Sequence, residues 1–130
     1  MRVLIVEDEL IIAIDVEASL AEEGHQVVGI ARESETALAL GRRLRPDLAL
    51  VDIQLVDGET GPEIARHLKD MGVPVLFMTA NADTLPSDMA GALGAVPKPV
   101  AEHVLKGAVR WVADPEADPP TTLVVNHPSG

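Results

Sequence analysis

Five residues with metal-binding or phosphate-binding side chains each follow a short apolar run: Glu7, Asp8, Asp52, Thr79 and Lys98. Carboxylates gathered in one place repel one another and raise each other's pKa unless a cation neutralises them. A set of oxygen-only ligands favours Mg²⁺, which keeps several waters and accepts phosphate oxygens. If the fold brings these residues together, they form a magnesium site beside one hydroxyl and one ammonium.

Aliphatic runs alternate along the chain with stretches of helical spacing. The predicted strands are residues 3–6, 26–31, 48–51, 74–78 and 95–96. The predicted helices are residues 10–23, 34–44, 62–71, 83–92 and 100–113, of which 83–92 is short and contains a proline. Uninterrupted apolar strands suit a sheet that is covered on both faces, and the alternation implies right-handed crossovers. We predict an α/β fold, a doubly wound five-stranded parallel sheet with helices on both faces.

In such sheets, ligand sites gather at the carboxyl ends of the strands. A single acid after a strand is ordinarily a helix cap or a solvated loop residue. Independent surface acids have no reason to share one sheet edge with a threonine and a lysine, so the set as a whole favours a functional site.

Composition excludes several other kinds of function. The 130-residue chain has no cysteine, which rules out disulfides, thiolate nucleophiles and cysteine zinc sites. Its formal charge of −11 and its two aromatic residues argue against nucleic acid and anionic membranes as partners. The longest apolar run, residues 10–14, is far short of the roughly 20 residues that span a bilayer. With no signal sequence before the first strand, we expect a cytoplasmic protein.

Two parts of the chain differ in composition. Residues 1–113 are predicted to form one domain, and residues 114–130 a proline-rich acidic tail without an output domain. Disorder is the ordinary interpretation of such a tail. Residues 121–125 are β-prone, however, and a stretch of this kind can also add to a sheet edge or dock on a partner.

Four segments, one at each strand end and in this order, resemble the receiver domain of two-component response regulators of the single-domain, chemotaxis-regulator-like type: Ile5-Val6-Glu7-Asp8-Glu9, Leu48-Ala49-Leu50-Val51-Asp52, Phe77-Met78-Thr79-Ala80 and Pro97-Lys98-Pro99. The resemblance covers about residues 1–113. Each motif alone is weakly informative, whereas the ordered set is specific.

The resemblance implies that Asp52 is the phosphoacceptor, taking a phosphoryl group from a phosphohistidine on a histidine kinase or phosphotransfer protein. Asp8 and Asp52 would bind Mg²⁺, with the backbone carbonyl of Gln54 as a further ligand. Glu7 would act mainly through a metal-bound water. The resemblance implies no other cofactor.

Further roles follow from the same resemblance. Lys98 would pair with Asp52 at rest and with the phosphoryl oxygens afterwards, while Thr79 would turn to hydrogen-bond the phosphoryl group. Gln54 and Asn81 would flank the attacking water and tune the lifetime of the acyl phosphate. Both are neutral amides, so neither acts as a general base.

One position departs from the family pattern. The residue three before Lys98 is often an aromatic that turns inward on activation, and here it is Ala95. Because the chain has no tyrosine, the usual threonine–tyrosine coupling is absent, and a signal from Thr79 must travel by rearrangement of a loop or helix. A dimer interface through the fourth helix and fifth strand is therefore not carried over.

The leading hypothesis is a single-domain response regulator, an Mg²⁺-dependent phosphoacceptor that signals to an unidentified downstream protein. It would catalyse only its own phosphorylation and dephosphorylation. One alternative is a receiver-like module that binds partners independently of phosphorylation. Another is a metal-dependent enzyme, but the Asp-x-Asp motifs of nucleases and phosphatases with strand-end carboxylates are absent after Asp52.

Overall fold

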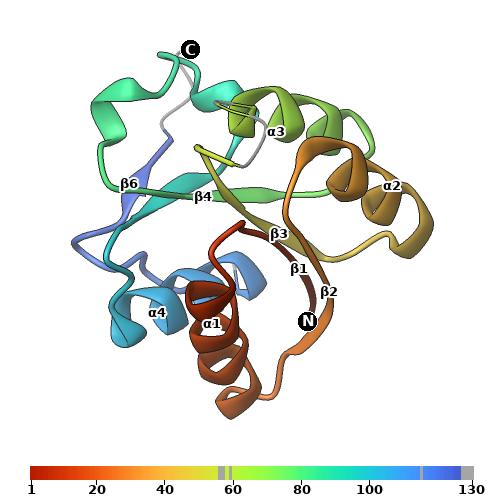
Figure 1. The fold of residues 1–130 in the computed structure, drawn as a ribbon. Helices are drawn as coiled ribbons and strands as arrows, with labels where there is room; N and C mark the ends of the chain where they lie inside the picture. The colour runs from red at the N-terminus through yellow and green to blue at the C-terminus, as the bar shows by residue number, and fades with distance from the viewer. Residues whose placement is uncertain (56–57, 59, 115, 127–130) are drawn as a thin grey trace.

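The computed structural model describes residues 1–55, 58, 60–114 and 116–126 of the chain (Figure 1). Its strands are β1 (Arg2–Val6), β2 (Gln26–Ala31), β3 (Leu48–Asp52), β4 (Val75–Thr79), β5 (Gly94–Pro97) and β6 (Val124–Val125). Its helices are α1 (Leu10–Glu22), α2 (Ser34–Leu44), α3 (Gly61–Asp70) and α4 (Glu102–Ala113), with two 3-10 turns, η1 (Ala82–Thr84) and η2 (Met89–Gly91).

The strands form one sheet in the order β2-β1-β3-β4-β5-β6. The first five strands are parallel, which confirms the predicted doubly wound α/β fold. The predicted count of five strands is one too low, because β6 pairs antiparallel with the outer edge of β5. This added strand comes from the β-prone part of the proline-rich tail, of which residues 115 and 127–130 lie outside the described part.

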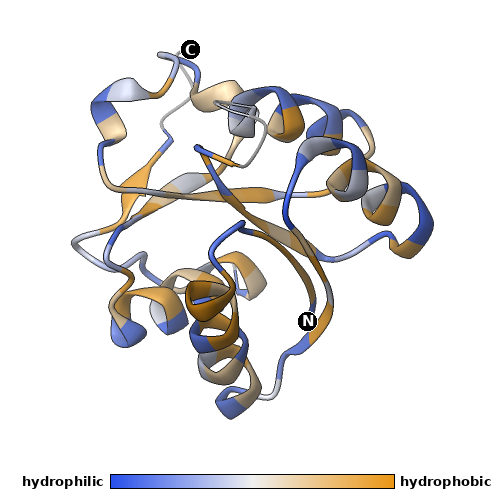
Figure 2. Ribbon diagram, viewed as in Figure 1, coloured by the Kyte–Doolittle hydropathy of each residue, from blue (hydrophilic) through white to orange (hydrophobic). Residues whose placement is uncertain are grey.

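Helices cover both faces of the sheet and alternate strand residues pack into each layer. Leu48 and Leu50 of β3 pack with α1 and α4, whereas Ala49 and Val51 pack with α2 and α3. Every residue of β3 and β4 is buried, as expected for strands that are apolar up to their last residues, Asp52 and Thr79. Figures 1 and 2 show the two helical layers with the hydrophobic strands between them.

The predicted helix 83–92 is wrong, since the segment forms only the two short turns η1 and η2. Pro86 lacks the backbone N–H that a continuous helix needs. The side chains of Asn81 and Asp88 instead accept hydrogen bonds from Asp83 N and Ala90 N, at 3.0 and 2.9 Å, and close separate turns. Such local bonds compete with helix formation.

The other predicted elements agree with the structure to within two residues at each end. Of the helices in the described part of the chain, none combines the length and apolarity needed to cross a membrane.

Gly61, the first residue of α3, holds this helix close to the end of β3. A Cβ added to Gly61 would lie 2.6 Å from Ile53 Cα and 2.7 Å from the carbonyl oxygen of Asp52, both backbone atoms. Only a shift of the backbone beside Asp52 could relieve this overlap.

We expect Gly61→Ala to lower the free energy of unfolding by about 1–3 kcal/mol in chemical denaturation. Gly29→Ala is the matched control, because its nearest neighbour is the movable end of the Leu40 side chain at 3.3 Å. Equal stability losses for the two variants would contradict this account of the α3–β3 contact.

Candidate functional site

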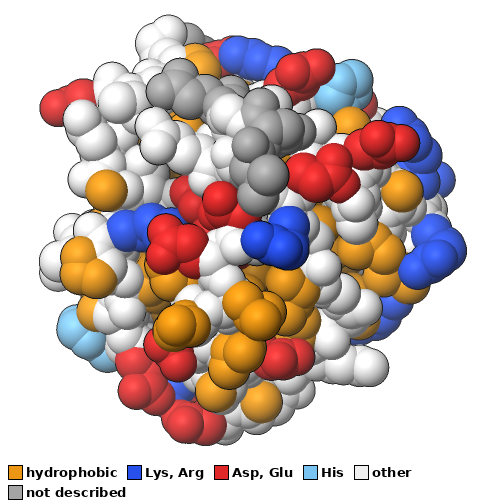
Figure 3. All heavy atoms as spheres, in the orientation of Figure 1, with side chains coloured by type: hydrophobic (Ala, Val, Ile, Leu, Met, Phe, Trp, Pro, Cys, Tyr) orange, Lys and Arg blue, Asp and Glu red, His pale blue; other side chains and the backbone are white. Residues whose placement is uncertain are grey.

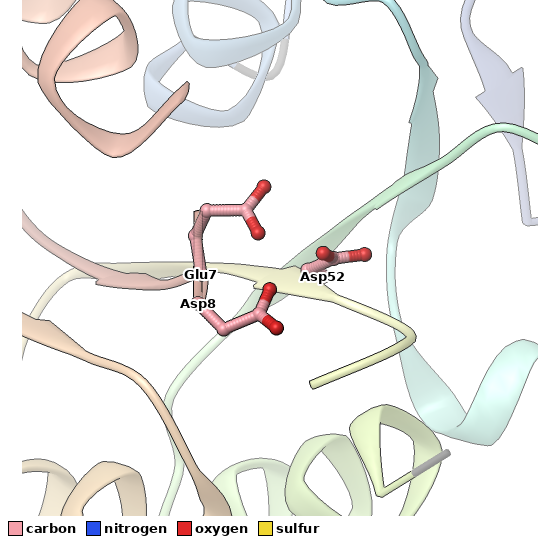
Figure 4. A group of neighbouring side chains, drawn as sticks. All are labelled: Glu7, Asp8 and Asp52. Carbon is pink, nitrogen blue, oxygen red and sulfur yellow. The ribbon is translucent and has the colours of Figure 1, made fainter. Parts of the chain in front are cut away.

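Neighbouring strands place three carboxylates at one edge of the sheet. Glu7 and Asp8 directly follow β1, and Asp52 is the last residue of the adjacent strand β3. One carboxylate oxygen from each of the three lies within 4.8 Å of the others, and the side chains converge in Figure 4. The cluster sits where the strand order reverses direction, the usual place for a ligand in a doubly wound sheet.

A lysine from the end of β5 completes the cluster. The ammonium of Lys98 donates to Glu7 Oε1 at 2.8 Å and to Asp52 Oδ2 at 3.0 Å. Glu7 is fully buried and Asp52 is only 6% exposed, so both ion pairs lie largely out of water. The contact between Lys98 and Glu7 was not predicted from sequence. The available signal was the presence of one cation among three acids at the same sheet edge.

The charges of this cluster do not balance. Three carboxylates and one ammonium leave two negative charges in excess when all are ionised. Burial, followed by the interaction with Asp52, raises the pKa of Glu7 to about 7, although Lys98 acts in the opposite direction. Burial alone would lower the pKa of Lys98, but its bonds to Glu7 and Asp52 outweigh burial and raise that pKa above its usual value.

The donor set fits a hard divalent cation. Its ligand atoms are carboxylate oxygens, which Mg²⁺ and Ca²⁺ prefer, and two positive charges would cancel the excess. The backbone N–H of Gln54 donates to Asp52 Oδ1 at 3.3 Å, which keeps this residue beside the cluster. Glu7, Asp8 and Asp52 could therefore hold such an ion.

Thr79 and Asn81 line a cleft together with the carboxylate cluster. The cleft has a volume of about 980 Å³ and is lined by Asp8, Asp52, Gln54, Thr79, Asn81 and Lys98 among others. The Thr79 hydroxyl donates to the carbonyl oxygen of Asn81 at 3.2 Å and accepts from Asn81 N at 3.1 Å. In this structure, therefore, the hydroxyl is bonded to its own loop.

Apolar side chains are exposed beside the cleft. Leu10, Ile11 and Ile14 at the start of α1 are 58%, 78% and 50% exposed. Figure 3 shows hydrophobic side chains gathered over α1, next to acidic and basic groups. A helix that is apolar on its outer face as well as its buried face is suited to contact another protein.

The charge imbalance predicts two opposite shifts in the pKa of Glu7, measured by NMR of its carboxyl carbon without divalent ions. Asp52→Asn should lower this pKa, because a neighbouring negative charge is lost, and Lys98→Met should raise it. Shifts of the same sign in both variants would contradict this account of the Glu7 pKa.

In the wild type, the folded chain holds the Glu7 proton up to about pH 7. The free energy of unfolding should therefore fall as pH rises from about 4.5 to 7, since the unfolded chain binds fewer protons there.

Comparisons with known proteins agree with this geometry. The family model for the response regulator receiver domain matches residues 3–110. The phyllosphere-induced regulator PhyR of Methylorubrum extorquens is 45% identical over 81 residues, which are 61% of this chain and 30% of that protein. The DNA-binding response regulator MtrA of Mycolicibacterium smegmatis is 34% identical over 127 residues, 95% of this chain and 55% of that protein.

A solved structure is also similar over most of its length. It is the signal receiver domain of a modulated diguanylate cyclase from Desulfovibrio desulfuricans, with a TM-score of 0.77 and 33% identity. The match covers 85% of this chain and 91% of that domain. The chain spans only 30% and 55% of the two regulators named above, so it corresponds to one part of each. Because the family model matches most of the length of this chain, the chain belongs to the response regulator receiver domain family.

Proposed function

We propose that this chain is an Mg²⁺-dependent phosphoacceptor, in which Asp52 receives a phosphoryl group from the phosphohistidine of a histidine kinase or phosphotransfer protein. The observation that carries the proposal is the buried Asp52 carboxylate, bonded to Lys98 within a cluster that has two negative charges in excess. The chain would signal through contacts with other proteins, and it would turn over no substrate other than its own acyl phosphate.

In the transfer step, an Asp52 carboxylate oxygen attacks phosphorus while the bond from phosphorus to the donor imidazole nitrogen breaks. That nitrogen keeps the electron pair and takes a proton from solvent. Glu7, Asp8 and Asp52 would hold Mg²⁺, which when bound would offset negative charge on the phosphoryl oxygens. Lys98, 3.0 Å from Asp52, supplies a fixed positive charge where the transferred oxygens arrive.

The exposed start of α1 supports a protein as the phosphodonor. Leu10 lies two residues after Asp8, so the apolar patch of Leu10, Ile11 and Ile14 borders the cleft. A donor that covers this patch would bring its phosphohistidine to the carboxylates and exclude water from the reacting atoms.

A phosphorylation-independent interaction module is the second candidate, and one observation favours it. Ala95 is fully buried and has no ring that could follow a movement of Thr79. Under this alternative, the exposed face of α1 would bind a partner whatever the state of Asp52.

Asp52→Asn should abolish phosphorylation by acetyl phosphate in the presence of Mg²⁺, because the neutral amide is a poor nucleophile. Intact mass spectrometry would show one added phosphoryl group on the wild type and none on the variant. Asp70→Asn, which changes an exposed aspartate at the end of α3, is the matched control and should be labelled normally. A wild type that takes no phosphoryl group would favour the interaction module.

The acyl phosphate should persist for minutes or longer without a phosphatase. The expected neighbours of the attacking water, Gln54 and Asn81, are amides that cannot remove its proton. Mass spectrometry after removal of the donor, acetyl phosphate, would follow the decay of the phosphorylated species and so measure this lifetime. A half-life of seconds would contradict these two tuning roles.

A further inference from the structure

The tail after α4 returns to the sheet and binds its outer edge. Val125 and Val124 of β6 pair with Gly94 and Ala95 of β5, and β6 closes that end of the sheet in Figure 1. Leu123, just before β6, is 94% buried and packs in the layer formed by α1 and α4. The tail thus occupies an edge that would otherwise offer free backbone groups to another chain.

Two glycines in separate elements make room for this tail. A Cβ added to Gly94 in β5 would lie 2.5 Å from the carbonyl oxygen of Val124, and one added to Gly107 in α4 would lie 2.7 Å from Pro120 Cγ. At both positions, the three nearest atoms all belong to the tail. Glycine is unfavourable inside a helix or strand, so its use at both contacts indicates that the tail has a built binding surface.

The end of the tail also holds the loop between β4 and β5. The side-chain amide of Asn126 donates to the carbonyl oxygens of Ala92 and Asp88, at 2.8 and 3.2 Å. Its backbone N–H donates to the carbonyl oxygen of Leu93 at 2.9 Å. Between these anchors, Met89 and Ala90 have φ of 50° and 52°, which side-chain-bearing residues rarely adopt. A conformation of this kind persists only where surrounding contacts enforce it.

The other end of this loop begins at the candidate site. The Thr79 hydroxyl makes both of its hydrogen bonds with Asn81, and the Asn81 side chain closes the turn η1. If Thr79 turns toward a phosphoryl group on Asp52, it must release Asn81. The loop that starts at Asn81 is the same loop that Asn126 holds at Asp88, Ala92 and Leu93.

We propose that residues 120–126 form an intramolecular latch on β5, which is bound in the resting chain and released when Asp52 is phosphorylated. The inference rests on the proposed phosphoacceptor function. It assigns the outer edge of β5 to the chain's own tail at rest, and it makes the loop 80–93 the connection between Thr79 and the latch. With this connection, the signal from Thr79 passes through the loop, and an aromatic ring that rotates at position 95 is not needed.

Amide hydrogen exchange tests the latch on the full chain, before and after phosphorylation with acetyl phosphate and Mg²⁺. Exchange at residues 121–126 should rise on the order of tenfold in the phosphorylated chain, the usual size of coupling between two sites. Gly94→Ala should raise exchange at the same residues without phosphorylation, because its Cβ displaces Val124. Gly29→Ala on β2, at the opposite edge of the sheet, should leave that exchange unchanged.

Linkage requires the reverse effect as well. If phosphorylation releases the latch, weakening the latch must favour the phosphorylated conformation by a similar factor. Beryllofluoride with Mg²⁺, a phosphoryl mimic, should therefore bind Gly94→Ala several-fold more tightly than the wild type. Asn126→Ala removes only the side-chain bonds to Asp88 and Ala92, and it should also bind beryllofluoride more tightly than the wild type. It serves as the test variant if Gly94→Ala does not fold.

Mass spectrometry of the same samples separates the possible failures. A chain that carries the phosphoryl group yet keeps its protection at residues 121–126 would overturn the latch and leave the proposed function standing. A chain that takes no phosphoryl group would overturn the proposed function and the phosphorylation-driven release together. Unchanged exchange in both Gly94→Ala and Asn126→Ala would show that these contacts do not hold the tail.

Discussion

A buried excess of negative charge at one sheet edge is the constraint on which the site depends. The single ammonium of Lys98 is shared by Glu7 and Asp52, and it cannot neutralise three carboxylates. Burial and, after it, the neighbouring Asp52 raise the pKa of Glu7, so that a proton can partly supply the missing positive charge. A bound divalent cation would supply it fully, and would leave the carboxylate of Asp52 available to react.

The fold maintains this arrangement through its sheet. Burial of β1 and β3 between two helical layers fixes the strand ends side by side, and β5 brings the lysine to the same edge. The close approach of Gly61 to the backbone at Asp52 holds α3 against the end of β3. At the far edge, the tail and the loop 80–93 bind each other, so the segment that leaves Thr79 is fixed at both of its ends.

Much of this could be predicted from sequence, because the carboxyl ends of parallel strands must meet. The cluster of Glu7, Asp8, Asp52 and Lys98 followed from that rule alone. The bond between Lys98 and Glu7 did not, since it depends on side-chain directions that strand order leaves open. The helix expected at 83–92 failed because local side-chain bonds close two short turns around a proline. The β-prone residues 121–125 left addition to a sheet edge open as one alternative. The contacts that accept the tail, at Gly94 and Gly107, join distant parts of the chain, and no local pattern reveals them.

The most direct test of the charge imbalance is a magnesium titration of the wild-type chain, followed by NMR of the carboxyl carbons of Glu7, Asp8 and Asp52. The account predicts that all three signals shift along one saturating curve, and that the pKa of Glu7 falls from about 7 toward its usual value as the ion binds. Carboxyl signals that stay in place at saturating magnesium, or a Glu7 pKa that the ion leaves unchanged, would contradict it.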